Sequence, residues 1–150
     1  MGLRPLLKST KIIISRKVYI ESVERSKEMG YKDAYEIESY INKKKIEIKS
    51  APKSKMEEYE EMFKIERGEG ESLALASELK LPMICDDKRG INAARILNIK
   101  RVSAIIVLET LYKRKKINKK AALEALNKLI KNGWYKQEII DSVKEEIEKC

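Results

Sequence analysis

The sequence predicts an α/β fold in which a short parallel sheet is covered by helices. Short β-branched or apolar runs alternate along the chain with segments whose apolar residues recur at helical spacing. Parallel strands need a crossover, so the order strand, helix, strand, helix favours a parallel sheet. The chain has 150 residues, of which 43% are hydrophobic and 38% charged. This length and composition predict a single folded domain over residues 1–150.

Four segments are predicted as strands. "KIIIS" is a continuous β-branched run, which is typical of a strand covered on both faces. "KIEIKS" alternates isoleucine with charge and predicts a half-exposed strand near a sheet edge. "LPMICD" and the apolar start of "RVSAIIVLET" supply the other two, and a direct run of the last strand into a helix around residues 105–107 is the alternative for its end. The predicted strands are 11–15, 45–50, 81–86 and 101–106.

Helices are predicted between and after these strands. The segment 16–30 ends in Gly30, which suits a helix stop, and 31–45 places tyrosines and isoleucines on one side. A polar segment, 51–67, has a helical centre. The glycines of "GEGE" (68–71) break that pattern, and a helix follows them. Another helix is predicted at 90–99, and a helical extension covers about 118–150, with Asn118 as a cap and Gly133 as a stop.

The charge balance indicates a polyanionic partner. Lys and Arg number 33 against 24 Asp and Glu, which gives a formal charge of +9. Such an excess attracts polyanions, and nucleic acid is the candidate partner, although many small, charge-rich proteins are basic without binding RNA or DNA. The stretch "YKRKKINKK" concentrates cations that could neutralise phosphates, although the same residues could simply keep a helical surface soluble. The candidate RNA-binding residues in this stretch are Lys115, Lys116, Lys119 and Lys120.

Several classes of function are excluded by residues that the sequence lacks. It contains no histidine, which excludes Ser-His and Cys-His nucleophilic catalysis and His-ligated zinc. Cys85 lies in an apolar run and is expected in the core, while Cys150 ends the sequence and is expected to be incidental. Nothing resembles a signal peptide or a membrane span, so a cytoplasmic location without membrane association is expected.

Three groups of acidic residues stand at predicted element boundaries. Asp86 and Asp87 follow a strand, where ligands gather in open parallel sheets, but Asp also starts turns and caps helices. Glu69 and Glu71 open a predicted helix, where the dipole alone stabilises acidic residues. Glu21 lies in the helix after the first strand and could be a solvated surface residue.

Together these groups resemble a known family. The segments "KIIISRKVYIESV", "YKDAYEIESYINKKKIEIK", "GEGESLALASELKLPMICDDKRGINAARILNIK" and "LETLYKRKKI" are similar, in this order, to the segments of a PIN domain. More narrowly, they resemble the archaeal and bacterial branch that is similar to VapC-type toxins. The resemblance extends from about Leu6 to about Trp134, and its "GE.E..ALA" and "DD.R...AA" elements are moderately specific as a pair.

The resemblance implies a three-layer α/β/α fold and, in active members, a ribonuclease that depends on Mg²⁺ or Mn²⁺. It implies catalytic roles for Glu21, Glu71 and Asp87. Because the register is ambiguous, either Glu69 or Glu71 could be the acid that opens the helix. Asp87 is preferred as a ligand, with Asp86 close by. Lys88 and Arg89 would hold the RNA backbone, and an antitoxin-like protein is a possible partner. The implied metal ligands are Glu21, Glu69, Glu71, Asp86 and Asp87.

The sequence also departs from the PIN pattern. Family members begin with a strand that ends in a metal-binding aspartate, whereas "MGLRPLLKST" resembles the tail of the helix after that strand. Cys85 occupies the place of the family's Ser or Thr. An incomplete acidic cluster predicts weaker metal binding. The alternative function is therefore a PIN fold that binds RNA or a protein without cutting. A missing strand would also leave an open sheet edge, from which a homo-oligomer is expected.

Overall fold

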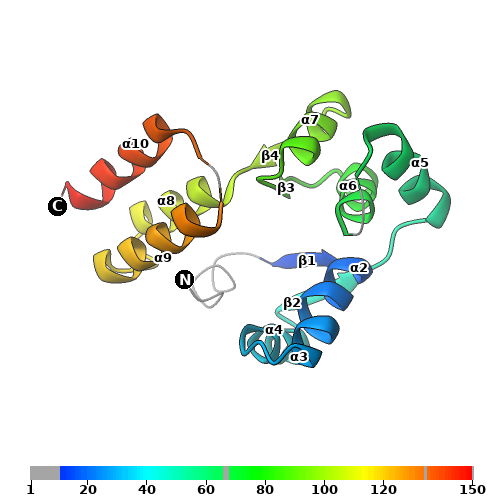
Figure 1. Cartoon of the computed structure of the whole chain (residues 1–150), viewed down its shortest axis with the longest axis horizontal. Helices are drawn as coiled ribbons and strands as arrows, with labels where there is room; N and C mark the ends of the chain where they lie inside the picture. The colour runs from blue at the N-terminus through cyan, green and yellow to red at the C-terminus, as the bar shows by residue number, and fades with distance from the viewer. Residues whose placement is uncertain (1–10, 66–67, 134, 150) are drawn as a thin grey trace. The chain divides into compact units, whose positions relative to one another are not determined.

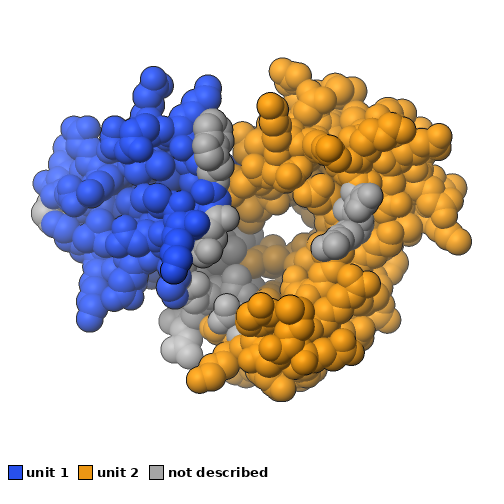
Figure 2. Space-filling view, in the orientation of Figure 1, with its two compact units in different colours: residues 1–9, 102–150 blue, residues 10–101 orange. Residues whose placement is uncertain are grey.

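A computed structural model describes residues 11–65, 68–133 and 135–149 of the chain. The chain divides into two compact units (Figure 2): unit 1 comprises residues 1–9 and 102–150, and unit 2 comprises residues 10–101. The helix tail that the sequence suggests within residues 1–10 lies outside the described residues, as does Cys150. Elements of both helix and strand type are present, in agreement with the predicted α/β class (Figure 1).

The first strand pair of unit 2 confirms the two N-terminal strand predictions. Strand β1 (Ile12–Ser15) pairs in parallel with β2 (Ile46–Lys49), and Ile12 lies opposite Ile46. The β-branched run favours an extended backbone, and Ile46 is buried. The crossover between the strands is helical, as a parallel pair requires. It consists of α2 (Arg16–Tyr19), the π-helical segment η1 (Ile20–Arg25), α3 (Ser26–Glu28) and α4 (Asp33–Asn42).

Two local features fix the ends of this crossover. The hydroxyl of Ser15 accepts a hydrogen bond from the backbone N–H of Val18 at 3.1 Å, so the last residue of β1 caps α2. Gly30 has a φ of +80° and follows α3, as expected for a glycine stop. The predicted helical character of 16–30 is confirmed, but its π-helical middle has no signal in the sequence.

The second half of unit 2 packs three helices around a small core. They are α5 (Lys53–Phe63), α6 (Gly68–Leu79) and α7 (Lys88–Ile96). The core brings the ring of Tyr59 and the side chain of Leu73 against the small residues of α7. Its buried members are Tyr59, Ile65, Leu73, Ala74, Ala93 and Ala94.

The glycines of "GEGE" lie in the first turn of α6. The prediction that they break the helical pattern of 51–67 and precede the next helix is therefore wrong. A methyl group on Gly68 would come within 2.4 Å of Val18 Cγ2, and one on Gly70 within 2.5 Å of Glu60 Cγ. The Glu60 carboxylate in turn binds Lys17 Nζ at 2.8 Å. These glycines therefore permit a close approach of α6 to α2 and α5.

The later strands are shorter than predicted. Strand β3 (Met83–Ile84) pairs with β4 (Arg101–Val102), and Met83 N–H donates to Lys100 O at 2.9 Å. The strand predicted over 101–106 is wrong for residues 104–106, because helix α8 begins at Ala104, close to the alternative helix start at 105–107. Ile105, Leu108 and Leu111 are buried at a spacing of three residues, which suits one face of a helix.

The described strands form two two-stranded sheets, β1-β2 and β3-β4, where the sequence predicts one sheet. Within the described residues, β1 and β3 each have one edge that pairs with no strand. Figure 2 shows an opening through unit 2, and in the same orientation β1 and β3 lie on either side of it in Figure 1. Ile84 in β3 is 52% exposed. Self-association through such edges stays a prediction.

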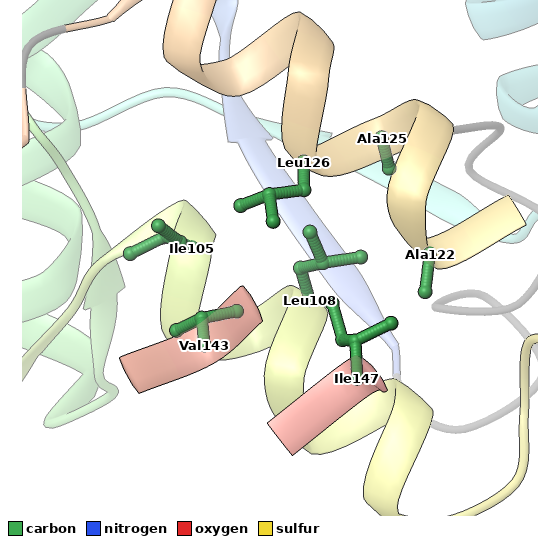
Figure 3. Close-up of a cluster of buried hydrophobic side chains, with 7 residues drawn as sticks. All are labelled: Ile105, Leu108, Ala122, Ala125, Leu126, Val143 and Ile147. Carbon is green, nitrogen blue, oxygen red and sulfur yellow. The ribbon is translucent and has the colours of Figure 1, made fainter. Parts of the chain in front are cut away.

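Unit 1 contains helices α8 (Ala104–Lys113), α9 (Lys119–Asn132) and α10 (Gln137–Glu148). Their apolar faces meet in one core, and the side chains from the three helices point toward one another (Figure 3). The Asn118 side chain accepts a hydrogen bond from Ala121 N–H at 2.8 Å, which confirms the predicted cap. None of the helices in the described ranges has the length and apolar character needed to cross a bilayer. The buried core residues are Ile105, Leu108, Ala122, Ala125, Leu126, Val143 and Ile147.

Candidate functional site

Two of the predicted acidic residues, Glu21 and Asp87, act electrostatically on a third, Glu69. Glu21 lies in η1, Glu69 is the second residue of α6, and Asp87 is the N-cap of α7. Burial raises the pKa of the Glu69 carboxyl, and the negative charges of Asp87 and Glu21 raise it further, while Arg89 opposes the shift. We call Glu21, Glu69 and Asp87 the carboxylate cluster.

Asp87 is fixed by the helix that it begins. Its Oδ2 accepts hydrogen bonds from the backbone N–H groups of Arg89 at 2.9 Å and Gly90 at 3.2 Å. Asp87 therefore caps α7, which is the helix-cap alternative that the sequence leaves open for this residue. At the same time it contributes charge to the cluster. The two roles are compatible because a carboxylate has two oxygens and several lone pairs.

Asp86 has a different environment from its neighbour. Its Oδ1 lies 4.0 Å from Arg101 Nη1, and the same guanidinium nitrogen donates to the backbone carbonyl of Cys85 at 2.9 Å. Arg101 thus holds the turn that carries both aspartates. Sequence reasoning missed this residue, because the contact depends on β3 and β4 being neighbours, which no local pattern reveals.

Glu71 is held by the backbone of unit 2. The residue is only 4% exposed, and its Oε2 accepts from Lys17 N–H at 2.8 Å while Oε1 accepts from Ala51 N–H at 3.2 Å. These bonds connect α6 to the start of α2 and to the segment after β2. They account for the burial of this carboxylate without a ligand. The catalytic and metal-binding roles of Glu71 stay predictions.

Cys85 is a buried thiol next to the cluster, as expected for a core residue. Burial raises the pKa of this thiol, and the charges of Glu69, Asp87 and Asp86 raise it further. The thiol donates weakly to the Asp87 carbonyl at 3.8 Å. It also lies against Gly90, where an added methyl group would come within 2.5 Å of Cys85 Sγ.

The predicted RNA-binding cations fall into two groups, one in each unit. Lys88 and Arg89 form the first turn of α7 and are exposed. Arg89 Nη1 donates to the backbone carbonyl of Lys64 at 2.8 Å, which fixes its position beside the cluster. The second group lies in unit 1, between the end of α8 and the first turn of α9, and all of its members are exposed: Lys115, Lys116, Lys119 and Lys120.

The carboxylate cluster suits a hard cation in its chemistry but not in its geometry. Mg²⁺ and Mn²⁺ prefer oxygen ligands, and the cluster offers three carboxylates. Across the described ranges, however, no group of three Cys, Asp or Glu residues comes together in a way that could hold a metal ion. The residues as they stand therefore do not fit a bound metal, and no catalytic step through one can be derived from them.

A family model described as a PIN domain matches residues 3–149. No curated protein matches the chain.

Proposed function

Because this chain belongs to the PIN-domain family, we propose that it binds RNA through its exposed cations, some of which stand beside the carboxylate cluster. One observation carries the proposal: Asp87, Lys88 and Arg89 are consecutive at the start of α7, so that cluster carboxylate and exposed cations share one helical turn. Phosphate groups paired with these cations would lie next to the cluster. This is the placement that a nuclease-like ancestry leads us to expect.

The charge of the rest of the chain supports the same proposal. The exposed lysines between α8 and α9 lie close together in the sequence, and Glu124 is the only acidic residue between Tyr112 and Lys131. Binding by such lysines releases counterions from RNA, so the affinity should fall steeply as salt increases.

Fluorescence anisotropy with a labelled single-stranded RNA tests the proposal. The measurement is made in EDTA at several salt concentrations, which separates binding from any metal-dependent step. We expect the combined variant Lys115→Glu, Lys116→Glu, Lys119→Glu and Lys120→Glu to lose most of the affinity. The matched control makes the same charge change in unit 2, at Lys32, Lys43, Lys45 and Lys53. Wild-type protein that shows no salt-dependent binding would contradict the proposal.

A second candidate function is RNA cleavage that depends on Mg²⁺ or Mn²⁺. The raised pKa of Glu69 favours it, because Asp87 and Glu21 repel the negative charge of Glu69 and a cation would relieve that repulsion. The PIN family is generally nuclease-like, which agrees with this candidate. The geometry of the cluster argues for weak activity at most, since it does not assemble a metal site.

Cleavage of single-stranded RNA with each metal distinguishes the two candidates. Asp87→Asn is the informative variant, because Asn caps helices as well as Asp does and so removes the charge while keeping the cap. Glu69→Gln and Glu21→Gln complete the set. Cleavage by the wild-type protein that these variants abolish would establish the ribonuclease. Cleavage that survives Asp87→Asn would come from a contaminating enzyme or from another site.

A further inference from the structure

Helix α7 has one buried face and one exposed face of different chemistry. Gly90, Ala93 and Ala94 are buried, and the two alanines belong to the core of unit 2. The opposite side carries Lys88, Ile91, Asn92 and Arg95, whose spacing of three, four and seven residues places them along one stripe. We call these four residues the α7 face.

The α7 face is cationic, and its guanidinium is held in place. No Asp or Glu stands between Lys88 and Ile96 in the sequence. Arg95 Nη2 donates to Asn92 Oδ1 at 2.7 Å, which orients the guanidinium one turn along the helix. The four residues, together with Arg89, line an open pocket of about 550 Å³. The described lining thus offers three cations, one amide and one aliphatic side chain.

We propose that the α7 face binds a short stretch of single-stranded RNA, with Lys88 and Arg95 on phosphates and Ile91 against a base. This inference rests on the proposed RNA binding and specifies where on unit 2 the strand lies. Seven residues of helix span about 10 Å. A nucleic-acid strand advances about 3.4 Å per nucleotide when stacked, so the two cations would bracket on the order of three nucleotides.

The composition of the face favours a single strand over a duplex. The major groove of an RNA duplex is deep and narrow, so side chains on a helix cannot read it. The bases of a single strand are accessible, and an aliphatic side chain such as Ile91 can pack against their faces. Asp87 caps the same helix, so a strand on the α7 face would begin beside the carboxylate cluster.

Anisotropy with a labelled ten-nucleotide oligouridylate in EDTA tests this inference. We compare wild type with Lys88→Glu/Arg95→Glu, and use Lys32→Glu/Lys45→Glu as a control with the same charge change in the same unit. We expect the α7 variant to bind at least tenfold more weakly. The slope of the logarithm of its association constant against the logarithm of salt concentration should be smaller in magnitude by about 1.4, because two single-strand phosphate contacts are lost. The control should lose much less affinity.

The outcomes separate this inference from the proposed function. If the α7 variant and its control lose affinity equally, while the variant of Lys115, Lys116, Lys119 and Lys120 loses most binding, the α7 face is not a binding site and the proposed function stands. If the wild type binds no RNA, both are overturned. Loss of affinity in the α7 variant, but not in its control, supports both the α7 binding site and the proposed function.

A second measurement isolates the base contact. Ile91→Ala should weaken binding to oligouridylate severalfold and leave binding to inorganic polyphosphate unchanged, because polyphosphate has no bases. Ile96→Ala, at a 61% exposed position on the same helix, is the control. Equal effects of Ile91→Ala on both ligands would overturn the assignment of Ile91 to a base.

Discussion

The thiol of Cys85 fills the space that a side chain on Gly90 would need: a methyl group there would come within 2.5 Å of the sulfur. Gly90 lies in the first turn of α7, directly behind the Asp87 cap. The position of the cap, and of the cluster residue that forms it, therefore depends on a contact between a glycine and a cysteine.

A double-mutant cycle tests this contact. Gly90→Ala should lower the free energy of unfolding by about 1–3 kcal/mol, because it overpacks a filled space. In a Cys85→Ala background the same change should be neutral or stabilising by up to about 1 kcal/mol, since Ala is the better helix former. Urea denaturation of the four proteins gives the coupling energy. Additive effects would show that the sulfur and the glycine do not interact.

Glu71→Gln should destabilise unit 2 by about 1–3 kcal/mol, because one acceptor oxygen is replaced by an N–H₂ group facing a backbone N–H. Both Glu71 oxygens accept backbone N–H donors in the structure, from Lys17 and Ala51. Chemical denaturation measures the effect, and Glu78→Gln, at an exposed position on the same helix, is the control. A stability equal to that of the control would mean that these hydrogen bonds contribute little.

Glu69→Gln should have the opposite effect on stability at neutral pH. The pKa of Glu69 is raised in the folded state, so its contribution is fully present below the ordinary carboxyl pKa and is lost as the pH rises through the folded pKa. The amide stays neutral and avoids repulsion from Asp87 and Glu21. We therefore expect the variant to be more stable than wild type near pH 7 and equal to it near pH 3.5. Denaturation curves at both pH values give the difference in the free energy of unfolding between the variant and wild type. A difference that is the same at both pH values would contradict the prediction.

The Cys85 thiol should react slowly and at an unusually high pH. Burial and the surrounding carboxylates raise its pKa, so the reactive thiolate is scarce in the folded protein. In a Cys150→Ser background, the rate of alkylation by iodoacetamide should rise at a higher pH in the folded protein than in urea. By the same linkage, the neutral thiol's contribution to stability is lost as the pH rises through its folded pKa. Alkylation at the rate of the unfolded chain would contradict this.

The sequence reveals the elements of this fold better than their boundaries. Strand β1 is predictable because a continuous β-branched run has few alternatives, and the helices of unit 1 follow from Asn118 and from apolar residues at helical spacing. The sequence predicts a strand that includes residues 104–106 because a short apolar run suits a strand or a buried helix equally well. Ile105 and Leu108 are buried in the core of unit 1, and this tertiary packing favours the helix.

The cluster shows where sequence reasoning stops. Glu21 and Asp87 can be proposed from their places after predicted strands. Glu69 and Glu71 cannot be told apart, because both lie in the first turn of α6 and point about 200° apart around its axis. Which one faces the cluster depends on how α6 packs against β1 and α2. That packing depends on Gly68 and Gly70, whose close contacts with Val18 and Glu60 are made across the fold.

The two hydrophobic cores have a consequence for cooperativity. The core of unit 1 and the side chains packed against it come from residues 105–147, and the core around Tyr59 and Leu73 comes from residues 51–99. Among the described residues, the two clusters share no member. Heat or denaturant therefore need not melt the chain in one step. A destabilising mutation at Leu108 or Leu126 should lower the midpoint of the unit 1 transition. The midpoint of unit 2, which contains the carboxylate cluster, should stay unchanged.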